Sequence, residues 1–322
     1  MDEYVFVNIL GRPVTWYALS IWLGCLGGAA LFLYEGRALK KNALWGTLIL
    51  GTVLGLFCAR AYYVLARFEL FNEIGWNHFF TTDDEYLKSW GAANGAAFWG
   101  AVGGVCLGAL ASAKLTGEKV SALLDALAPS AALAIGISRF GEYSIGEGIG
   151  PDVEAEELFF FPMAVVNEWD EWKFAVFMLE GIAAAVIFLL LMTRGRKLKD
   201  GYRARMFLIY YSSAQIILEA LRRDNFLRWL FVRVSQVASA VVLLGLIVFA
   251  VIRWTRIPRA KRMPTKKLVL CCTLFAAMIG AIVALEFAVD KSPYISMGVA
   301  YLLEAACCGV IGICTWQVVM KH

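Results

Sequence analysis

Residues 138–150 combine glycines with charged side chains in a pattern that could support chemistry at a membrane edge. The segment reads Ser-Arg-Phe-Gly-Glu-Tyr-Ser-Ile-Gly-Glu-Gly-Ile-Gly and contains Arg139, Glu142 and Glu147. It directly follows an apolar run, and an acidic, aromatic loop comes after it. A charged side chain at such a position costs free energy, so it is usually paired or functional. We therefore expect the remaining apolar runs to build a polar pocket around this segment.

Three other polar segments are expected to lie at the same depth in the membrane. Residues 60–63 end one apolar run, residues 94–104 begin another, and residues 215–223 end a third. Two of these segments contain arginine, and a guanidinium group can bind a phosphate group through two parallel hydrogen bonds. We infer a pocket that accepts a phospholipid head group.

Glu180 and Glu219 are among the carboxylates that lie inside apolar runs. An ionisable side chain within a membrane usually faces a partner or a cavity. We expect Glu219 to pair with Arg139 or with Arg222. The alternative for Arg60 and Arg222 is that each only extends from a helix end toward the lipid phosphates.

The composition and its arrangement predict an all-α fold, a polytopic integral membrane helical bundle. Of the 322 residues, 60% are hydrophobic, whereas a soluble domain has roughly 45–50% apolar residues. The excess forms runs close to the ~20 residues that span a bilayer as a helix. Nine spans are predicted, at about residues 14–34, 43–65, 96–113, 122–137, 174–192, 206–221, 230–252, 268–289 and 295–320.

Basic residues are concentrated in alternate connections between these spans. Of the 30 lysines and arginines, 19 are predicted on one side of the membrane. They are Lys321 and the basic residues of the connections at 36–43, 114–119, 194–205 and 253–267. Basic connections stay in the cytoplasm. The pattern therefore predicts an outside N-terminus, a cytoplasmic C-terminus, and outward loops at residues 67–95 and 139–172.

The sequence offers no recognisable set of metal ligands. It has two histidines, and none of its eight cysteines lies in a Cys-x-x-Cys pattern or near a histidine. Zinc sites need Cys, His or carboxylate ligands at characteristic spacings. We expect no metal, no organic cofactor and no nucleic-acid partner.

The segment 138–150 resembles the signature of the bacterial prolipoprotein diacylglyceryl transferase family, Gly-Arg-x-Gly-Asn-Phe-x-Asn-Gly-Glu-x-x-Gly. Five residues of this signature are present, namely Arg139, Gly141, Gly146, Glu147 and Gly150. Shorter matches follow the family order at Trp16-Tyr17, Arg60-Ala61-Tyr62-Tyr63, Ala128-Pro129, Glu180-Gly181, and Glu219 with Arg222.

The resemblance covers about residues 10–255 and implies seven family-like spans. It predicts a membrane domain at residues 1–255, followed at 256–322 by a basic linker and a hairpin of two extra C-terminal spans. It also implies a set of substrate-binding residues, namely Tyr17, Arg60, Tyr63, Gly141, Gly146, Gly150, Glu219 and Arg222.

The sequence departs from the family pattern at positions that matter for the chemistry. Trp99 stands where the family has a histidine, a candidate base for a thiol, and Gln215 stands where it has an arginine that helps to hold the lipid. Glu142 stands in place of an asparagine. Without the histidine, the resemblance leaves Glu142 or Glu147 as the base beside Arg139, and these three are the expected catalytic residues.

The resemblance implies a transferase of the bacterial plasma membrane. It would move a diacylglyceryl group from phosphatidylglycerol, or a related anionic phospholipid, to the lipobox cysteine of a lipoprotein precursor at the outer leaflet. One alternative is a paralogue that keeps the lipid pocket but uses another acceptor or only binds lipid. A second alternative is a channel or transporter, although the sequence has no internal repeat of the kind that many transporters show.

Overall fold

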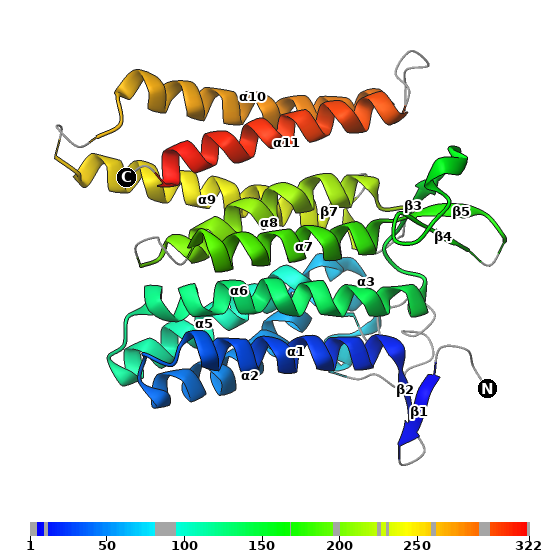
Figure 1. Cartoon of the computed structure of the whole chain (residues 1–322), viewed down its shortest axis with the longest axis horizontal. Coiled ribbons are helices and arrows are strands. Elements are labelled where there is room, and N and C mark those ends of the chain that lie inside the picture. Colours follow the sequence, from blue (N-terminus) through cyan, green and yellow to red (C-terminus); the bar gives the residue numbers. More distant parts are fainter. Residues whose placement is uncertain are drawn as a thin grey trace.

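The computed structural model describes residues 5–9, 12–80, 95–167, 169–195, 200–223, 227–229, 232–258, 262–289 and 297–320. Nine helices of 18 residues or more run side by side within these ranges (Figure 1). They are α1 (Trp16–Glu35), α2 (Lys41–Ala66), α5 (Phe98–Thr116), α6 (Val120–Ser138), α7 (Val176–Thr193), α8 (Tyr202–Leu221), α9 (Val234–Arg256), α10 (Thr265–Val289) and α11 (Met297–Met320). The predicted all-α bundle is confirmed.

Eight of the nine helices are long and apolar enough to cross a membrane. The ninth, α8, corresponds to the predicted span 206–221 and carries Arg203, Arg205 and Glu219. It packs against α6, α7, α9 and α11. A polar helix is tolerated in such a place because its charged side chains face other helices. The chain is therefore a multi-pass membrane protein.

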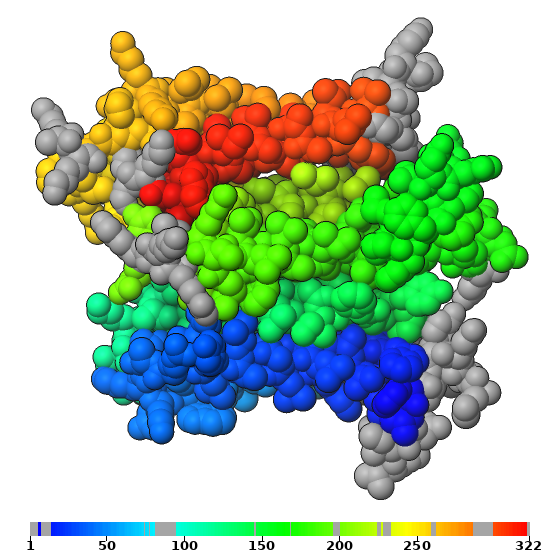
Figure 2. All heavy atoms as spheres, viewed as in Figure 1, coloured from blue at the N-terminus to red at the C-terminus, as the bar shows by residue number. Residues whose placement is uncertain are grey.

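The helices succeed one another across the bundle nearly in chain order. The pair α1 and α2 lies on one side, and α10 and α11 form an outer layer on the other (Figures 1 and 2). The closest pair is α2 and α5, where Gly104 and Gly108 of α5 touch the α2 backbone. Small residues permit this approach in a membrane, as the glycine-rich run 96–113 predicted.

Short elements lie at the end of the bundle where α1 begins. After α2 the chain forms α3 (Phe68–Ile74) and the 3₁₀ helix η1 (Trp76–Phe79), so the loop predicted at residues 67–95 contains short helical segments; residues 81–94 lie outside the described part. Beyond α6 come η2 (Arg139–Ile145), β3 (Ile149–Asp152), η3 (Glu156–Leu158), β4 (Ala164–Val166) and β5 (Trp172–Ala175).

Three small antiparallel sheets were not predicted. One pairs β1 (Val5–Ile9) with β2 (Arg12–Thr15), one has the order β3-β5-β4, and one pairs β6 (Arg228–Trp229) with β7 (Val232–Arg233). The first two lie at the same end of the bundle (Figure 1). The sheet β3-β5-β4 fixes the path by which the chain leaves the glycine-rich segment and enters α7.

Candidate functional site

The glycine-rich segment is held against the first turn of α1. A side chain at Gly141 would overlap the Ser20 hydroxyl and come within 2.8 Å of the Tyr17 Cα, so only glycine fits there. The Ser20 hydroxyl also donates a hydrogen bond of 3.1 Å to the carbonyl oxygen of Ser138. These contacts place Tyr17 beside the start of η2, whose first residue is Arg139.

The later glycines turn the chain from η2 toward β3. Gly146 and Gly148 have φ angles of +65° and +70°, a conformation that other residues rarely adopt. A Cβ at Gly148 would lie 2.7 Å from Oε2 of Glu142, and one at Gly150 would lie 2.8 Å from the Val176 side chain. The turn therefore packs Gly148 and Gly150 against the beginning of α7, where the Phe177 N–H also donates to the carbonyl oxygen of Gly148.

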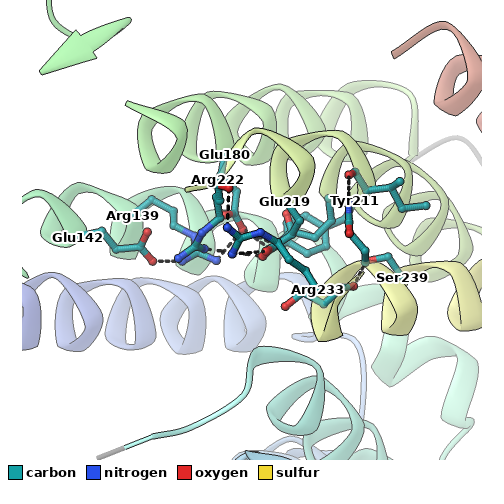
Figure 3. Close-up of polar contacts among 12 residues, drawn as sticks. Arg139, Glu142, Glu180, Tyr211, Glu219, Arg222, Arg233 and Ser239 are labelled. Atoms are coloured by element: carbon teal, nitrogen blue, oxygen red, sulfur yellow. Dashed lines mark hydrogen bonds and ion pairs between the residues drawn. The ribbon is translucent and has the colours of Figure 1, made fainter. Parts of the chain in front are cut away.

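Arg139 is held by two carboxylates inside the bundle (Figure 3). Its Nη1 donates to Oε1 of Glu142, and its Nη2 donates to Oε1 of Glu180 at 2.6 Å. The same Glu180 oxygen accepts a hydrogen bond of 2.6 Å from the Tyr211 hydroxyl and one of 3.1 Å from Nε2 of Gln215. Glu180 and Tyr211 are each 1% exposed, so this arrangement is shielded from water.

A second group of charges continues the arrangement along α8. Nε2 of Gln215 lies 3.5 Å from Oε1 of Glu219. Glu219 in turn forms ion pairs with Nη1 of Arg222 at 3.7 Å and with Nη1 of Arg233 at 3.9 Å. The expected pairing of Glu219 with Arg222 is therefore present, while Arg139 uses Glu142 and Glu180.

The six ionised side chains of this network balance in formal charge. Three are carboxylates and three are guanidinium groups: Glu142, Glu180, Glu219, Arg139, Arg222 and Arg233. None of the three carboxylates is more than 5% exposed. Buried charges are tolerated only when paired and hydrogen-bonded. The network joins η2 to α7, α8 and the residue that precedes α9 (Figure 3).

Tyr17, Glu147 and Tyr63 lie beside this network. The Tyr17 hydroxyl interacts electrostatically with Glu147, Arg139 and Arg222. Glu147 also interacts with the hydroxyl of Tyr63. Glu147 is partly exposed, whereas Glu142 is buried. The structure thus gathers two predicted arginines, one carboxylate and two tyrosines from four separate segments of the chain.

Arg60 has a different environment. Its Nε donates to the carbonyl oxygen of Phe79 and its Nη1 to that of Gly95, both at 2.8 Å. Its guanidinium also lies 5.5 Å from the ring centre of Tyr63, which is fully buried. Arg60 therefore links Phe79 and Gly95, which both lie in the predicted loop at residues 67–95. Its predicted role in binding substrate stays a prediction.

Tyr211 and Arg233 belong to the network, although sequence reasoning did not select them. Tyr211, Gln215 and Glu219 are spaced by four residues, which places them on one face of a helix. That spacing was a usable signal for Tyr211. Arg233 is the residue directly before the apolar run of α9. A position at a helix end favoured a solvent-facing role, and only the packed structure reveals its contact with Glu219.

Two grooves among the described residues flank the exposed ring of Phe140. One of about 490 Å³ runs between α1 and η2, and its walls include Trp16, Leu23 and Tyr143. The other, of about 230 Å³, lies between α6 and α7 and is almost wholly apolar, with Gly136 on its wall. Both reach residues adjacent to Arg139. The groove between α6 and α7 fits a hydrocarbon chain because its lining is almost wholly apolar, whereas the larger groove also has Ser20 and Ser144 on its walls.

No cluster of three or more His, Cys, Asp or Glu side chains suited to a metal ion occurs in the described ranges. The side chains that the network and its neighbours bring together are guanidinium groups, carboxylates, an amide and tyrosine hydroxyls.

Comparison with known proteins decides the family. The model of the prolipoprotein diacylglyceryl transferase family matches residues 4–252. The chain belongs to this family. A Bacillus licheniformis relative named phosphatidylglycerol–prolipoprotein diacylglyceryl transferase is 28% identical over 239 residues, covering 72% of this chain and 85% of the relative. A Shouchella clausii protein of the same name is 28% identical over 267 residues, covering 80% and 93%.

The family match has a clear limit within the structure. It covers α1 to α8 and nearly all of α9, whereas α10 and α11 lie beyond residue 252. All six ionised residues of the network fall inside the matched range. The helices that carry the site therefore lie inside the family match, and the C-terminal hairpin lies outside it.

Proposed function

We propose that this protein transfers a diacylglyceryl group from phosphatidylglycerol to the cysteine thiol of a lipoprotein precursor, at the outer face of the bacterial plasma membrane. The observation that carries the proposal is the buried network in which Arg139, held by Glu142 and Glu180, lies beside Arg222 and its partner Glu219 (Figure 3). The names of the relatives describe the same reaction. The basic connections support this orientation, because they are concentrated at the opposite end of the predicted topology and basic connections usually stay in the cytoplasm.

The two arginines provide a place for the lipid phosphodiester. Arg139 is fixed by Glu142 and Glu180, so its guanidinium needs little reorganisation when substrate enters. The ion pair of Arg222 with Glu219 is 3.7 Å long, and an anionic phosphodiester can take over part of that attraction. The Tyr17 hydroxyl would orient the phosphate from the side of α1. The acyl chains would lie in the two grooves beside Phe140.

The reaction forms a carbon–sulfur bond and breaks a carbon–oxygen bond. The thiol sulfur attacks the glyceryl carbon attached to the phosphate oxygen, and glycerol phosphate leaves with the bonding electron pair. Arg139 and Arg222 would stabilise the charge on that leaving group. Glu147 would accept the thiol proton, because it is partly exposed and near Tyr17, whereas Glu142 is engaged with Arg139.

The domain division follows the same reasoning. Residues 1–255 would form the catalytic membrane domain, and residues 256–322 would add the basic linker and the hairpin α10–α11. The hairpin contacts α8 and α9 but contributes none of the residues assigned to the reaction.

A liposome assay tests the proposed function. Purified protein is mixed with phosphatidylglycerol and a lipobox peptide, and the peptide mass is measured. We expect wild-type protein to add a diacylglyceryl group, and Arg139→Ala to abolish this addition. Arg139→Lys keeps the charge without the fork of two donors, and we expect it to lose at least about tenfold in rate.

The control is Arg37→Ala, at the opposite end of α1, where Arg37 lies over the Tyr34 ring. It should transfer at the wild-type rate, and thermal unfolding in detergent should verify that all variants are folded. Undiminished transfer by Arg139→Ala would refute the role of Arg139. Lipid binding by the wild type without any product would instead favour the paralogue that only binds lipid.

A further inference from the structure

Several buried polar atoms around Arg139 have no hydrogen-bond partner among the described residues. They include Oε2 of Glu142, Oε1 of Gln215 and Nε1 of Trp99. These side chains are only 5%, 2% and 8% exposed. Nearly all buried polar atoms in proteins are hydrogen-bonded, so a group of exceptions at one place calls for an explanation.

The side chains that carry these atoms are joined by direct contacts. Glu142 and Glu180 each hold one terminal nitrogen of Arg139, and Gln215 donates to Glu180 through the nitrogen of its amide. The Trp99 ring packs 6.0 Å, between centres, from the ring of Tyr211, which also donates to Glu180. Glu142 therefore touches the guanidinium that we assign to the phosphate, Gln215 is linked to it through Glu180, and Trp99 packs against Tyr211, another donor to Glu180.

The three atoms form a chemically consistent set. Glu142 and Gln215 offer acceptors, and the Trp99 indole offers a donor. A hydroxyl group can pair with the acceptors and with the donor, because it donates one hydrogen bond and accepts others, whereas an ammonium group only donates. These are also the three positions noted above at which the sequence departs from the family pattern, so the departures act together on one feature of the site.

We propose that Glu142 and Gln215, with Trp99, are specificity-determining residues that recognise the hydroxyl groups of the lipid head group. The hydroxyls would donate to Oε2 of Glu142 and to Oε1 of Gln215, and one of them would accept from the indole of Trp99. This rests on the proposed function, in which the hydroxylated end of the head group departs with the phosphate. The site would therefore select a polyol head group and discriminate against one that bears a methyl ester or an ammonium group.

The test compares donor lipids that share a phosphodiester and differ in the head group. Phosphatidylglycerol carries two hydroxyls, phosphatidylmethanol has the same charge without them, and phosphatidylethanolamine carries an ammonium group. For the wild type we expect kcat/KM with phosphatidylglycerol to exceed that with either other lipid by about tenfold or more. In Gln215→Leu and in Glu142→Ala we expect the ratio between phosphatidylglycerol and phosphatidylmethanol to fall to within about threefold of unity.

Ser213→Ala is the matched control, because Ser213 also lies on α8 but faces Gly312 of α11. It should keep the wild-type ratio. The ratio separates recognition from folding, since a general loss of structure lowers both rates together. Two variants are used so that, if one of them fails to fold, the other still gives the ratio of kcat/KM values.

The outcomes distinguish this proposal from the proposed function. Equal use of phosphatidylglycerol and phosphatidylmethanol by the wild type would overturn the recognition of hydroxyls while transfer stands. A preference for phosphatidylethanolamine, or an unchanged ratio in both variants, would do the same. If none of the three lipids yields product, the proposed function fails and this inference fails with it.

Discussion

Glu180 accepts hydrogen bonds at a single carboxylate oxygen from Arg139, Tyr211 and Gln215. It is 1% exposed, so its charge depends on these donors for stabilisation. Removing one partner of a buried ion pair costs more than the pair contributes, because the other charge remains without compensation. Glu180 is therefore the residue through which a change on α7 reaches both η2 and α8.

Glu180→Gln should destabilise the protein by about 3–5 kcal/mol, since Arg139 would retain one carboxylate instead of two. Thermal or denaturant unfolding in detergent measures this change. Glu118→Gln is the control, because Glu118 lies in the exposed turn between α5 and α6 and should shift stability by less than about 0.5 kcal/mol. Equal stability of the two variants would contradict the central place of Glu180 in the network.

At the scale of elements, the packing of α5 on α2 depends on single glycines. A Cβ at Gly104 would overlap the carbonyl of Leu54, whereas a Cβ at the neighbouring Gly103 would meet nothing within 4 Å. Both residues are in the interior of the same helix. The pair therefore separates the effect of helix contact from the effect of helix propensity.

We expect Gly103→Ala to stabilise the protein slightly, because alanine is favoured over glycine in a helix by about 1 kcal/mol. Gly104→Ala gains the same propensity but forces α5 away from α2, and overpacking of this kind costs about 1–3 kcal/mol or more. Unfolding midpoints of the two variants in one detergent give the comparison. A Gly104→Ala protein as stable as Gly103→Ala would mean that α2 and α5 do not pack so closely.

The hairpin α10–α11 illustrates what helix packing adds to sequence. Three contacts show that α11 runs antiparallel to α8 and the residues just after it. Arg205 donates to the carbonyl of Val319 at 3.4 Å, Tyr210 stacks on Trp316 with ring centres 5.4 Å apart, and Arg223, two residues beyond α8, donates to the Tyr301 hydroxyl at 2.6 Å. The two spans were predictable from their apolar length, but the helix they cover was not. Apolar length carries no information about which face of α8 is turned toward α11.

For the whole molecule, the spans and the position of Arg139 could be predicted, but its partners could not. Apolar runs near bilayer length locate helices directly. The prediction that Glu219 pairs with Arg139 or Arg222 left two options open, because choosing between them needs the rotation of α7 and α8 about their axes. The strands β3 to β5 have only three or four residues each, too short for an alternating pattern to be visible.

The orientation of the whole molecule gives the last prediction. The site end should face outward, because 19 of the 30 basic residues lie on the other side of the predicted topology. Glu157→Cys lies at the site end, in η3, and Glu118→Cys lies at the opposite end. All eight native cysteines are in apolar segments, which limits their reaction with a polar reagent.

A membrane-impermeant maleimide added to intact cells should label Glu157→Cys and leave Glu118→Cys unlabelled. After the cells are opened, both variants should react, which shows that each cysteine is accessible in the folded protein; the wild-type chain gives the background. The reverse pattern in intact cells would place Arg139 and Arg222 on the cytoplasmic side. A transferase that modifies an exported thiol could not then work from this site, because the acceptor and the arginines would be separated by the bilayer.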